Sequence, residues 1–230
     1  MLFYGIDSTY LLLVLPAVIF AFWAQSNVQS TFKKYSKIHV PGMTGYDSAR
    51  IILDSNGLNH VKIEHVSGNL TDHFDPKSNV IRLSDSVYSA NSAAAVGVAA
   101  HEAGHAVQHA LGYTPIKIRS AIIPITNIGS NLAMPLVLLG ILLSFPGLAY
   151  AGIAAFGLST IFQLITLPVE FNASNRAMQA LKTGGRMTGE EISASGRVLR
   201  AAALTYVAAL AVSLANLLRL LSLVNRSSRR

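Results

Sequence analysis

Long apolar segments constrain this chain more than any other feature of its sequence. Of its 230 residues, 51% are hydrophobic and only 13% are charged, against roughly 25% charged in a soluble globular domain. A helix needs about 20 apolar residues to cross the roughly 30 Å hydrocarbon core of a bilayer. The segments 9–24, 121–145, 147–169 and 201–218 reach or approach that length. The sequence therefore predicts an α-helical membrane protein with about four transmembrane helices.

The distribution of lysine and arginine predicts how these segments are oriented. None precedes the first segment, whereas nine lie between residues 25 and 120 and five between residues 170 and 200. Cytoplasmic loops are enriched in lysine and arginine, so we expect both regions to face the cytoplasm and the N-terminus to lie outside. The chain is therefore predicted to begin with a transmembrane anchor at 1–24, followed by a cytoplasmic α+β unit at 25–120. A transmembrane hairpin follows at 121–169, with its turn at Phe145-Pro146-Gly147. The rest consists of a cytoplasmic helical segment at 170–200 and a C-terminal transmembrane helix with a basic tail at 201–230.

The first and last apolar segments each admit an alternative. A cleaved signal peptide has a basic n-region and a small-x-small cleavage pattern. The first segment has neither, and carries Phe22 and Trp23 where that pattern would stand, so we expect an anchor. The last segment precedes Arg226, Arg229 and Arg230, which fall on the outer side in this scheme. It could instead lie along the membrane surface or pack on the cytoplasmic unit.

Cysteine content and charge exclude further classes. The chain has no cysteine, which rules out disulfides and thiolate metal sites and fits a reducing compartment. The net charge of +7 is explained by the loops expected inside the cell. Aromatic and basic residues do not alternate as they do on a nucleic-acid-binding surface. We therefore expect the lipid bilayer, and no nucleic acid, as a partner.

Residues 25–120 predict a small α+β unit, because helix-capping patterns and alternating β-rich segments occur in turn. In chain order the expected elements are a helix with Thr44 and Asp47 in a capping box and Gly57 at its end, a strand at 60–66, a polar loop at 69–76, a strand at 79–84, and a helix that begins after Asn91 or Ser92 and ends at Gly112.

The last of these helices carries His-Glu-Ala-Gly-His at 101–105. Residues four apart share a helix face, so His101 and His105 could hold one ion. Glu102 is turned by roughly 100° and could reach a water on that ion. Two imidazoles, an open position and a carboxylate base are the parts of a catalytic zinc site. The pattern also arises by chance, but three histidines and a glutamate are costly to bury on an apolar helix without a purpose.

A catalytic zinc needs a third protein ligand. The metzincin pattern would require glycine at 108 and histidine at 111, where this chain has Gln108 and Leu111. His109 lies roughly 12 Å along the helix axis from His101, too far for a ligand bond of about 2 Å. We therefore expect His109 to support the site or the packing of the helix rather than to bind the ion.

Elimination favours Glu170 as the third ligand. No histidine or aspartate follows residue 109, and the later carboxylates are Glu170, Glu190 and Glu191. Glu191 completes a capping box with Thr188. Glu170 follows the third apolar segment, and the two spans of the hairpin return it to the side of His105. Its alternative is an interfacial charge that closes a transmembrane helix.

The chain resembles the neutral zinc metallopeptidases of bacterial membranes, the YugP-like family. The resemblance rests on LTDHFDP, NVIRLSDSVY, VAAHEAGHAVQH and LPVEFNAS in that order. More distantly the chain is similar to HtpX-type membrane proteases, which have an aspartate where Ser174 stands here. This departure leaves open which group orients the imidazoles, with Asp72, Asp75, Asp85 and Asn172 as candidates. The resemblance implies the bacterial plasma membrane as the location.

Together these features predict a membrane-embedded zinc metalloprotease of the gluzincin type, with a zincin-like unit facing the cytoplasm. One Zn²⁺ would be held by His101, His105 and Glu170, and Glu102 would deprotonate the zinc-bound water that attacks a peptide bond. Proteins or peptides are the expected substrates, with membrane proteins among the candidates. An extended substrate could add to the edge of the strand at 79–84, and a purely structural role for that strand is the equal alternative. His73, Tyr113 and Arg176 are candidate oxyanion donors.

Three alternatives to this function are weaker. An intramembrane protease of the site-2 type would draw an aspartate ligand from a later span, and the sequence has none. A zinc-binding transporter or sensor would place histidine and aspartate within the spans, which here carry almost no charge. An inactive scaffold would be expected to have lost the glutamate of the motif, whereas Glu102 is intact.

Overall fold

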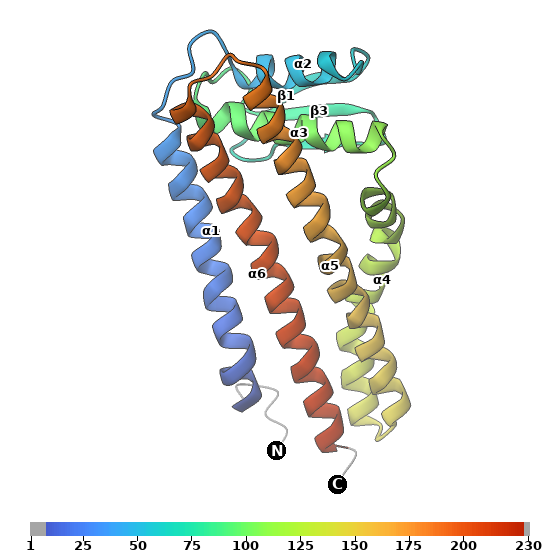
Figure 1. Cartoon of the computed structure of the whole chain (residues 1–230). Coiled ribbons are helices and arrows are strands. Elements are labelled where there is room, and N and C mark those ends of the chain that lie inside the picture. The colour runs from blue at the N-terminus through green and yellow to red at the C-terminus, as the bar shows by residue number, and fades with distance from the viewer. Residues whose placement is uncertain (1–7, 228–230) are drawn as a thin grey trace. The chain divides into compact units, whose positions relative to one another are not determined.

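The computed structural model describes residues 8–227, which are mostly helical. The chain divides into two compact units, each built from segments that are distant in sequence. The first unit comprises the described parts of Met1–Gln25, Ile118–Leu167 and Thr205–Arg230, and the second comprises Ser26–Lys117 and Pro168–Leu204. In chain order the elements in Figure 1 are a short π-helix (Tyr10–Val14), α1 (Leu15–Tyr35), α2 (Gly45–Ser55), β1 (Lys62–Val66), β2 (His73–Asp75), β3 (Val80–Ser84), α3 (Ala93–Ala110), α4 (Thr114–Leu142), α5 (Pro146–Thr183) and α6 (Gly189–Ser227).

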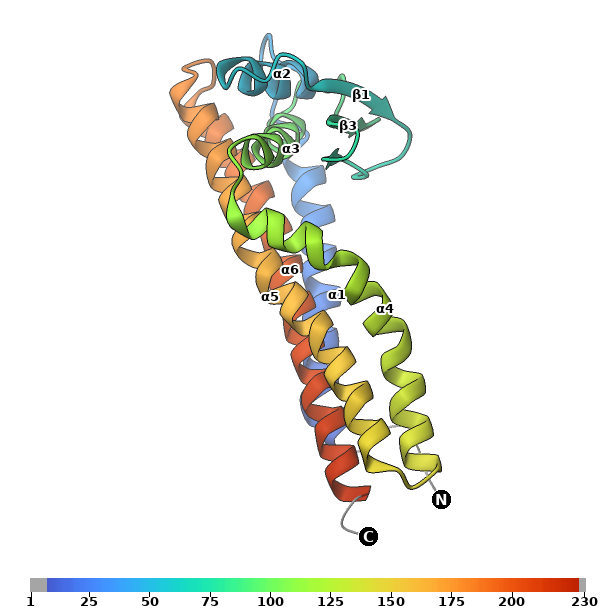
Figure 2. The ribbon, with the colours of Figure 1, turned by 90° about the vertical axis from the view of Figure 1, so that its right-hand side faces the viewer.

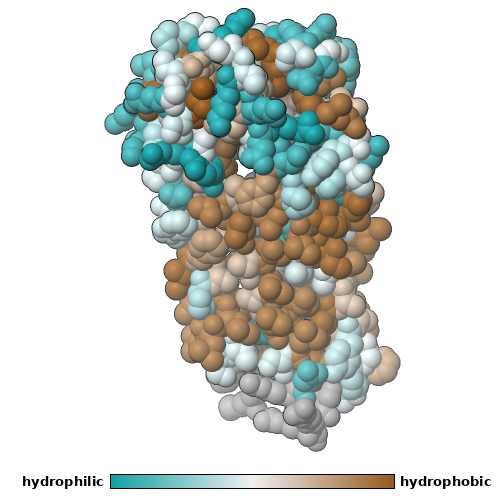
Figure 3. Space-filling view, viewed as in Figure 1, coloured by the Kyte–Doolittle hydropathy of each residue, from teal (hydrophilic) through white to brown (hydrophobic). Residues whose placement is uncertain are grey.

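Four helices in the described part of the chain are long and apolar enough to cross a membrane, which confirms the expected number. They cover Tyr10–Tyr35, Thr114–Leu142, Pro146–Thr183 and Gly189–Asn225. In the first unit many large hydrophobic side chains are exposed, and Figure 3 shows hydrophobic side chains gathered on one face over its helices. Large exposed apolar surfaces of this kind mark contact with a membrane or a partner. Arg229 and Arg230 of the predicted basic tail lie outside the described residues.

Small residues bring α4 and α5 close together in the first unit. A Cβ atom built on Gly140 would lie 2.3 Å from the backbone nitrogen of Ala149, and one on Gly152 would lie 2.6 Å from the carbonyl oxygen of Ala133. Only glycine fits such an approach, which is typical of helix pairs in lipid, where van der Waals packing and interhelical hydrogen bonds replace hydrophobic burial.

The second unit contains a three-stranded sheet in the order β1-β3-β2. β1 pairs with β3 in parallel, and β2 pairs with β3 antiparallel. The strands at Lys62–Val66 and Val80–Ser84 confirm the two predicted ones. The prediction of a polar loop over the whole of 69–76 is wrong, because His73–Asp75 forms β2 and its Phe74 packs against the core. Three residues are too few for an alternating pattern to be visible in the sequence.

The central position of β3 removes one expected substrate site. On one side β3 pairs with β1 over Val80–Ser84, and on the other it pairs with β2 over Val80–Arg82. The backbone N–H of Ser84 donates to the Asp72 carboxylate at 2.7 Å. The prediction that the segment 79–84 offers an edge for strand addition is therefore wrong. The open edges of this sheet belong to β1 and β2.

Local capping fixes the helices of this unit. The predicted capping box of α2 is present: Thr44 Oγ1 accepts from the Asp47 N–H at 3.2 Å, and Asp47 Oδ2 accepts from the Thr44 N–H at 2.9 Å. Ser92, one of the two predicted candidates, caps α3 by accepting from the Ala95 N–H. Past the end of α3, Gly112 has φ +65°, which glycine adopts readily.

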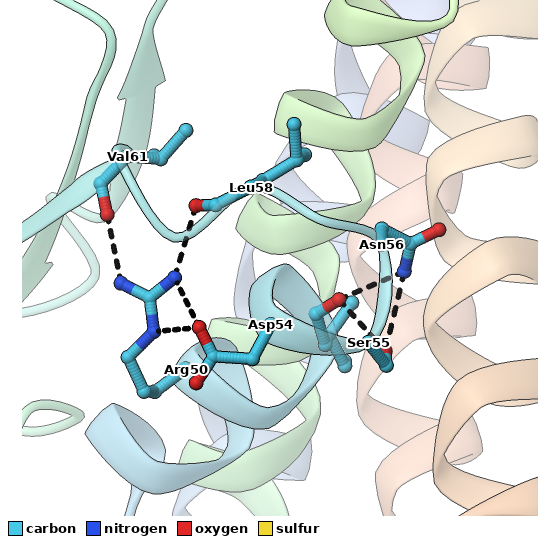
Figure 4. A network of polar contacts seen from close by, with 7 residues as sticks. Arg50, Asp54, Ser55, Asn56, Leu58 and Val61 are labelled. Atoms are coloured by element: carbon cyan, nitrogen blue, oxygen red, sulfur yellow. Dashed lines mark hydrogen bonds and ion pairs between the residues drawn. The ribbon is translucent and has the colours of Figure 1, made fainter.

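Arg50 anchors the connection from α2 to β1, as Figure 4 shows. Its guanidinium donates to the carbonyl oxygens of Val61 at 2.8 Å and Leu58 at 3.0 Å, and it pairs with Asp54 at 2.8 Å. A planar guanidinium can satisfy several acceptors at once. The side chain thereby fixes the start of the sheet relative to α2.

α3 lies at the centre of the second unit, beside α2 in Figures 1 and 2. All its alanines before Ala110 are almost completely buried, among them Ala99, Ala100 and Ala103 at 0% exposure. A Cβ atom on Gly104 would lie 2.6 Å from the carbonyl oxygen of Ala173 on α5. This close approach of α3 to α5 places the predicted ligands of the two helices side by side.

Replacing Gly104 by alanine should therefore force the two helices apart. We expect Gly104→Ala to destabilise the protein by about 1–3 kcal/mol, as overpacking does, measured as a lower midpoint of thermal unfolding in detergent. Gly157→Ala is the matched control on α5, since nothing lies within 4 Å of its added Cβ. Alanine favours helix there, so its midpoint should stay the same or rise. Equal effects of the two substitutions would contradict the close approach.

Candidate metal centre

The structure brings His101, His105 and Glu170 together. His101 and His105 face the same way from α3, with their ring centroids 4.6 Å apart. Oε2 of Glu170, on α5, lies 3.2 Å from His101 Nε2 and 3.4 Å from His105 Nε2. One ligand atom of each residue lies within 4.8 Å of the others. Within residues 8–227 this is the group of His, Asp and Glu side chains whose geometry suits an ion.

These separations fit a small tetrahedral ion. Around zinc, with ligand bonds of about 2.0–2.1 Å, neighbouring donor atoms of a tetrahedron lie about 3.3 Å apart. The two nitrogen-to-oxygen distances here are 3.2 and 3.4 Å. Two imidazoles and one carboxylate also form a donor set that leaves one position open. The residues present therefore fit one zinc ion.

The site concentrates charge in a buried environment. Glu170 is only 2% exposed and His105 only 8%. Burial acts to lower the pKa of His105, but the hydrogen bond to Glu170 and the negative charges of Glu102 and Glu170 outweigh it and raise that pKa above its usual value. The acidic residues thus favour positive charge at this position, which is the electrostatic requirement for binding a cation.

Gln108 orients the ring of His105. Its Oε1 contacts His105 Nδ1 at 2.9 Å, and its Nε2 donates to the carbonyl oxygen of Val169 at 2.8 Å and to Asn172 Oδ1 at 2.9 Å. The Val169 carbonyl can only accept, which identifies the amide end of Gln108. Oε1 therefore accepts from His105 Nδ1–H, and Nε2 of the imidazole is left for an ion.

Ser174 orients the ring of His101 in a similar way. Its Oγ lies 3.1 Å from His101 Nδ1, on the side of the ring away from Glu170. With Nε2 as the ligand atom, Nδ1–H donates to this hydroxyl, which can accept. The distant resemblance to HtpX-type enzymes implied an aspartate at this position, whereas here the neutral oxygen of Ser174 contacts the ring.

Sequence reasoning missed both of these orienting groups. Asp72 accepts hydrogen bonds from Ser84, and Asp75 and Asp85 bind other loop and strand residues. None of the three contacts the ring of His101 or His105, and Asn172 reaches His105 only through Gln108. One signal was available: Gln108 follows His105 by three residues, on the same helix face.

Glu102 lies beside the ligand pair and is only 8% exposed. Within residues 8–227 no hydrogen-bond donor contacts its carboxylate. Its charge acts on a neighbouring acid: burial raises the pKa of Asp72, hydrogen bonds from Ser84 oppose this, and the negative charge of Glu102 adds to the increase. The predicted role of Glu102 as a base stays a prediction.

His109 and the glutamates that follow α5 lie apart from this group. The exposed ring of His109 packs against Phe74, at 5.8 Å between centroids. Glu191 Oε2 accepts from the Thr188 N–H at 2.8 Å, which confirms the predicted capping box of α6. Of the candidate oxyanion donors, Arg176 donates to Asn172 at 2.8 Å, and His73 contacts the carbonyl oxygen of Thr71.

The sequence matches the family described as "Putative neutral zinc metallopeptidase" over residues 10–225. The chain belongs to this family. It is 48% identical over 211 residues to a protein of Bacillus subtilis (strain 168) named "Putative membrane protease YugP", a match that covers 91% of this chain and 94% of the relative. No solved structure matches the chain. Family membership confirms the resemblance inferred from the four sequence segments.

If Gln108 fixes the ring of His105, removing its hydrogen bonds should weaken zinc binding. We expect Gln108→Met, which keeps the volume of the side chain, to lower zinc affinity about 10–100-fold, measured by competition with a chromophoric chelator. The matched control is Gln179→Met, on the exposed side of α5, which should bind zinc as the unchanged protein does. Unchanged affinity in Gln108→Met would show that the ring is held by other groups.

Proposed function

We propose that the chain is a membrane-embedded zinc metalloprotease, with a zincin-like catalytic unit formed by the second unit. The observation that carries this proposal is the convergence of His101, His105 and Glu170 around one position, next to Glu102, in a chain of the neutral zinc metallopeptidase family. Membership alone would support a peptidase. The geometry supports His101, His105 and Glu170 as the ligands and Glu102 as the base.

In this proposal His101, His105 and Glu170 hold one Zn²⁺. When bound, zinc supplies a Lewis acid that lowers the pKa of water and polarises a carbonyl group. A carboxylate oxygen of Glu102 accepts a proton from the attacking water, and the same oxygen then donates that proton to the amine nitrogen of the leaving group. Gln108 and Ser174 keep both imidazoles in the orientation that this requires.

Burial supports the assignment of these roles. Glu102, His105 and Glu170 are each at most 8% exposed. A carboxylate shielded from bulk water interacts more strongly with nearby charge than an exposed one. The small side chains of α3 allow this burial, because they let the neighbouring segments pack closely around the site.

The direct experiment separates the base from the ligands. Glu102→Gln should retain one zinc per chain and lose at least about 100-fold in casein cleavage, since general-base catalysis contributes about 10²–10⁴-fold. Glu170→Ala should lose zinc as well as cleavage. Zinc content by elemental analysis and casein hydrolysis are measured on the same purified samples. Full activity in Glu102→Gln would refute the role of the base, and full zinc content in Glu170→Ala would refute the third ligand.

We further propose that the site faces the cytoplasm of the plasma membrane, on the basis of the lysine and arginine distribution. The chain has no cysteine, so a single introduced thiol reports on one position. Ser144, exposed between α4 and α5, and Ser67, exposed after β1, are suitable.

A membrane-impermeant thiol reagent should label Ser144→Cys on intact cells and Ser67→Cys only after the cells are permeabilised. The opposite pattern would place the catalytic unit outside the cell. Labelling of both positions in permeabilised cells controls for access to each thiol.

A further inference from the structure

A basic pocket lies within the second unit, apart from the residues of the metal centre. It has a volume of about 290 Å³ and is open to the surface. The C-terminal turns of α1 and the residues 197–204 of α6 form its walls. Its lining consists of Asn27, Thr31, Lys34 and Tyr35 from α1 and Arg197, Arg200, Ala201 and Leu204 from α6.

The charged residues of this pocket are all positive, beside an apolar part of the lining. Lys34, Arg197 and Arg200 contribute three cations, and no carboxylate is among the lining residues. In the described part of the chain none of the three forms an ion pair. Like charges repel when they gather without a counterion, so such a concentration attracts an anion.

The hydrogen-bond donors available suit a phosphate. Arg200 donates Nε to the Gly196 carbonyl at 3.2 Å, which orients the guanidinium and leaves its terminal nitrogens for another acceptor. Thr31 donates to Asn27 Oδ1 at 3.5 Å, so the amide nitrogen of Asn27 can still donate. Arginine forks match phosphate oxygens in pairs, and neutral donors complete such sites.

The neighbouring sequence indicates where this phosphate comes from. Within α1, Asn27 lies about 4.5 Å along the axis from Ala24, the last residue of an apolar segment. Within α6, the pocket residue Ala201 is also the first residue of the apolar segment 201–218. Both walls therefore adjoin the parts of their helices that suit hydrocarbon. Lipid headgroup phosphates lie at that boundary, and basic pockets between transmembrane helices bind them.

We propose that this pocket binds the phosphate of an anionic phospholipid. Arg197, Arg200 and Lys34 contact the phosphate oxygens, and Ala201 and Leu204 line the path of the glycerol and acyl groups. The site is independent of the metal centre, so its test does not need peptidase activity. Basic residues orient a membrane protein through their charge alone, whereas lipid binding here also requires the shape of the pocket.

The test compares two double substitutions that remove the same charge. Arg197→Gln/Arg200→Gln removes two exposed cations that line the pocket, and Lys182→Gln/Arg186→Gln removes two equally exposed cations that do not line it. Each full-length protein is reconstituted in nanodiscs of phosphatidylcholine mixed with phosphatidylglycerol. After transfer to detergent, native mass spectrometry counts retained phosphatidylglycerol. Inorganic phosphate is added as a competitor in a separate arm.

The unchanged protein should retain phosphatidylglycerol in preference to phosphatidylcholine. The pocket variant should lose this preference by roughly thirtyfold, given the usual contribution of basic residues at an anionic surface, while the control variant keeps it. Equal loss in both variants, or no loss in the pocket variant, would overturn the proposal. Displacement of the lipid by millimolar inorganic phosphate would also overturn it, by making the pocket a site for free phosphate.

Discussion

One carboxylate oxygen joins the two helices of the site: Oε2 of Glu170 contacts both imidazoles of the α3 pair, at 3.2 and 3.4 Å. Because Glu170 is 2% exposed, its charge could not be buried without compensation. The histidines, or a cation between them, supply that compensation. This contact requires α3 and α5 to lie close together, and a Cβ atom on Gly104 would lie only 2.6 Å from the carbonyl oxygen of Ala173.

Polar groups from both helices extend this contact into a connected network. His105 donates to Gln108, which donates to the Val169 carbonyl and to Asn172, which in turn accepts from Arg176. Gln108 is 0% exposed, and buried polar groups of this kind must be satisfied to be stable. The ring of one ligand is therefore fixed by the backbone of the helix that carries the other ligand. A displacement of α5 would disturb both at once.

The sequence predicted those features of the fold and the site that depend on residues close together in the chain. The spacing of His101 and His105, the capping box at Thr44 and the two longer strands each depend on residues within a few positions. Glu170 was reached by elimination, because few carboxylates follow residue 109. The roles of Gln108 and Ser174 could not be predicted, since they depend on how α3 and α5 meet. β2 and the central position of β3 depend on strand pairing, which a segment of three residues does not reveal.

X-ray absorption at the zinc edge of the purified, zinc-loaded protein tests the centre most directly. We expect two imidazole nitrogens and oxygen donors at about 2.0–2.2 Å around one zinc. In His105→Ala, any zinc that is still bound should show one imidazole fewer. A spectrum with three imidazoles, or one that His105→Ala leaves unchanged, would show that the ion is bound elsewhere.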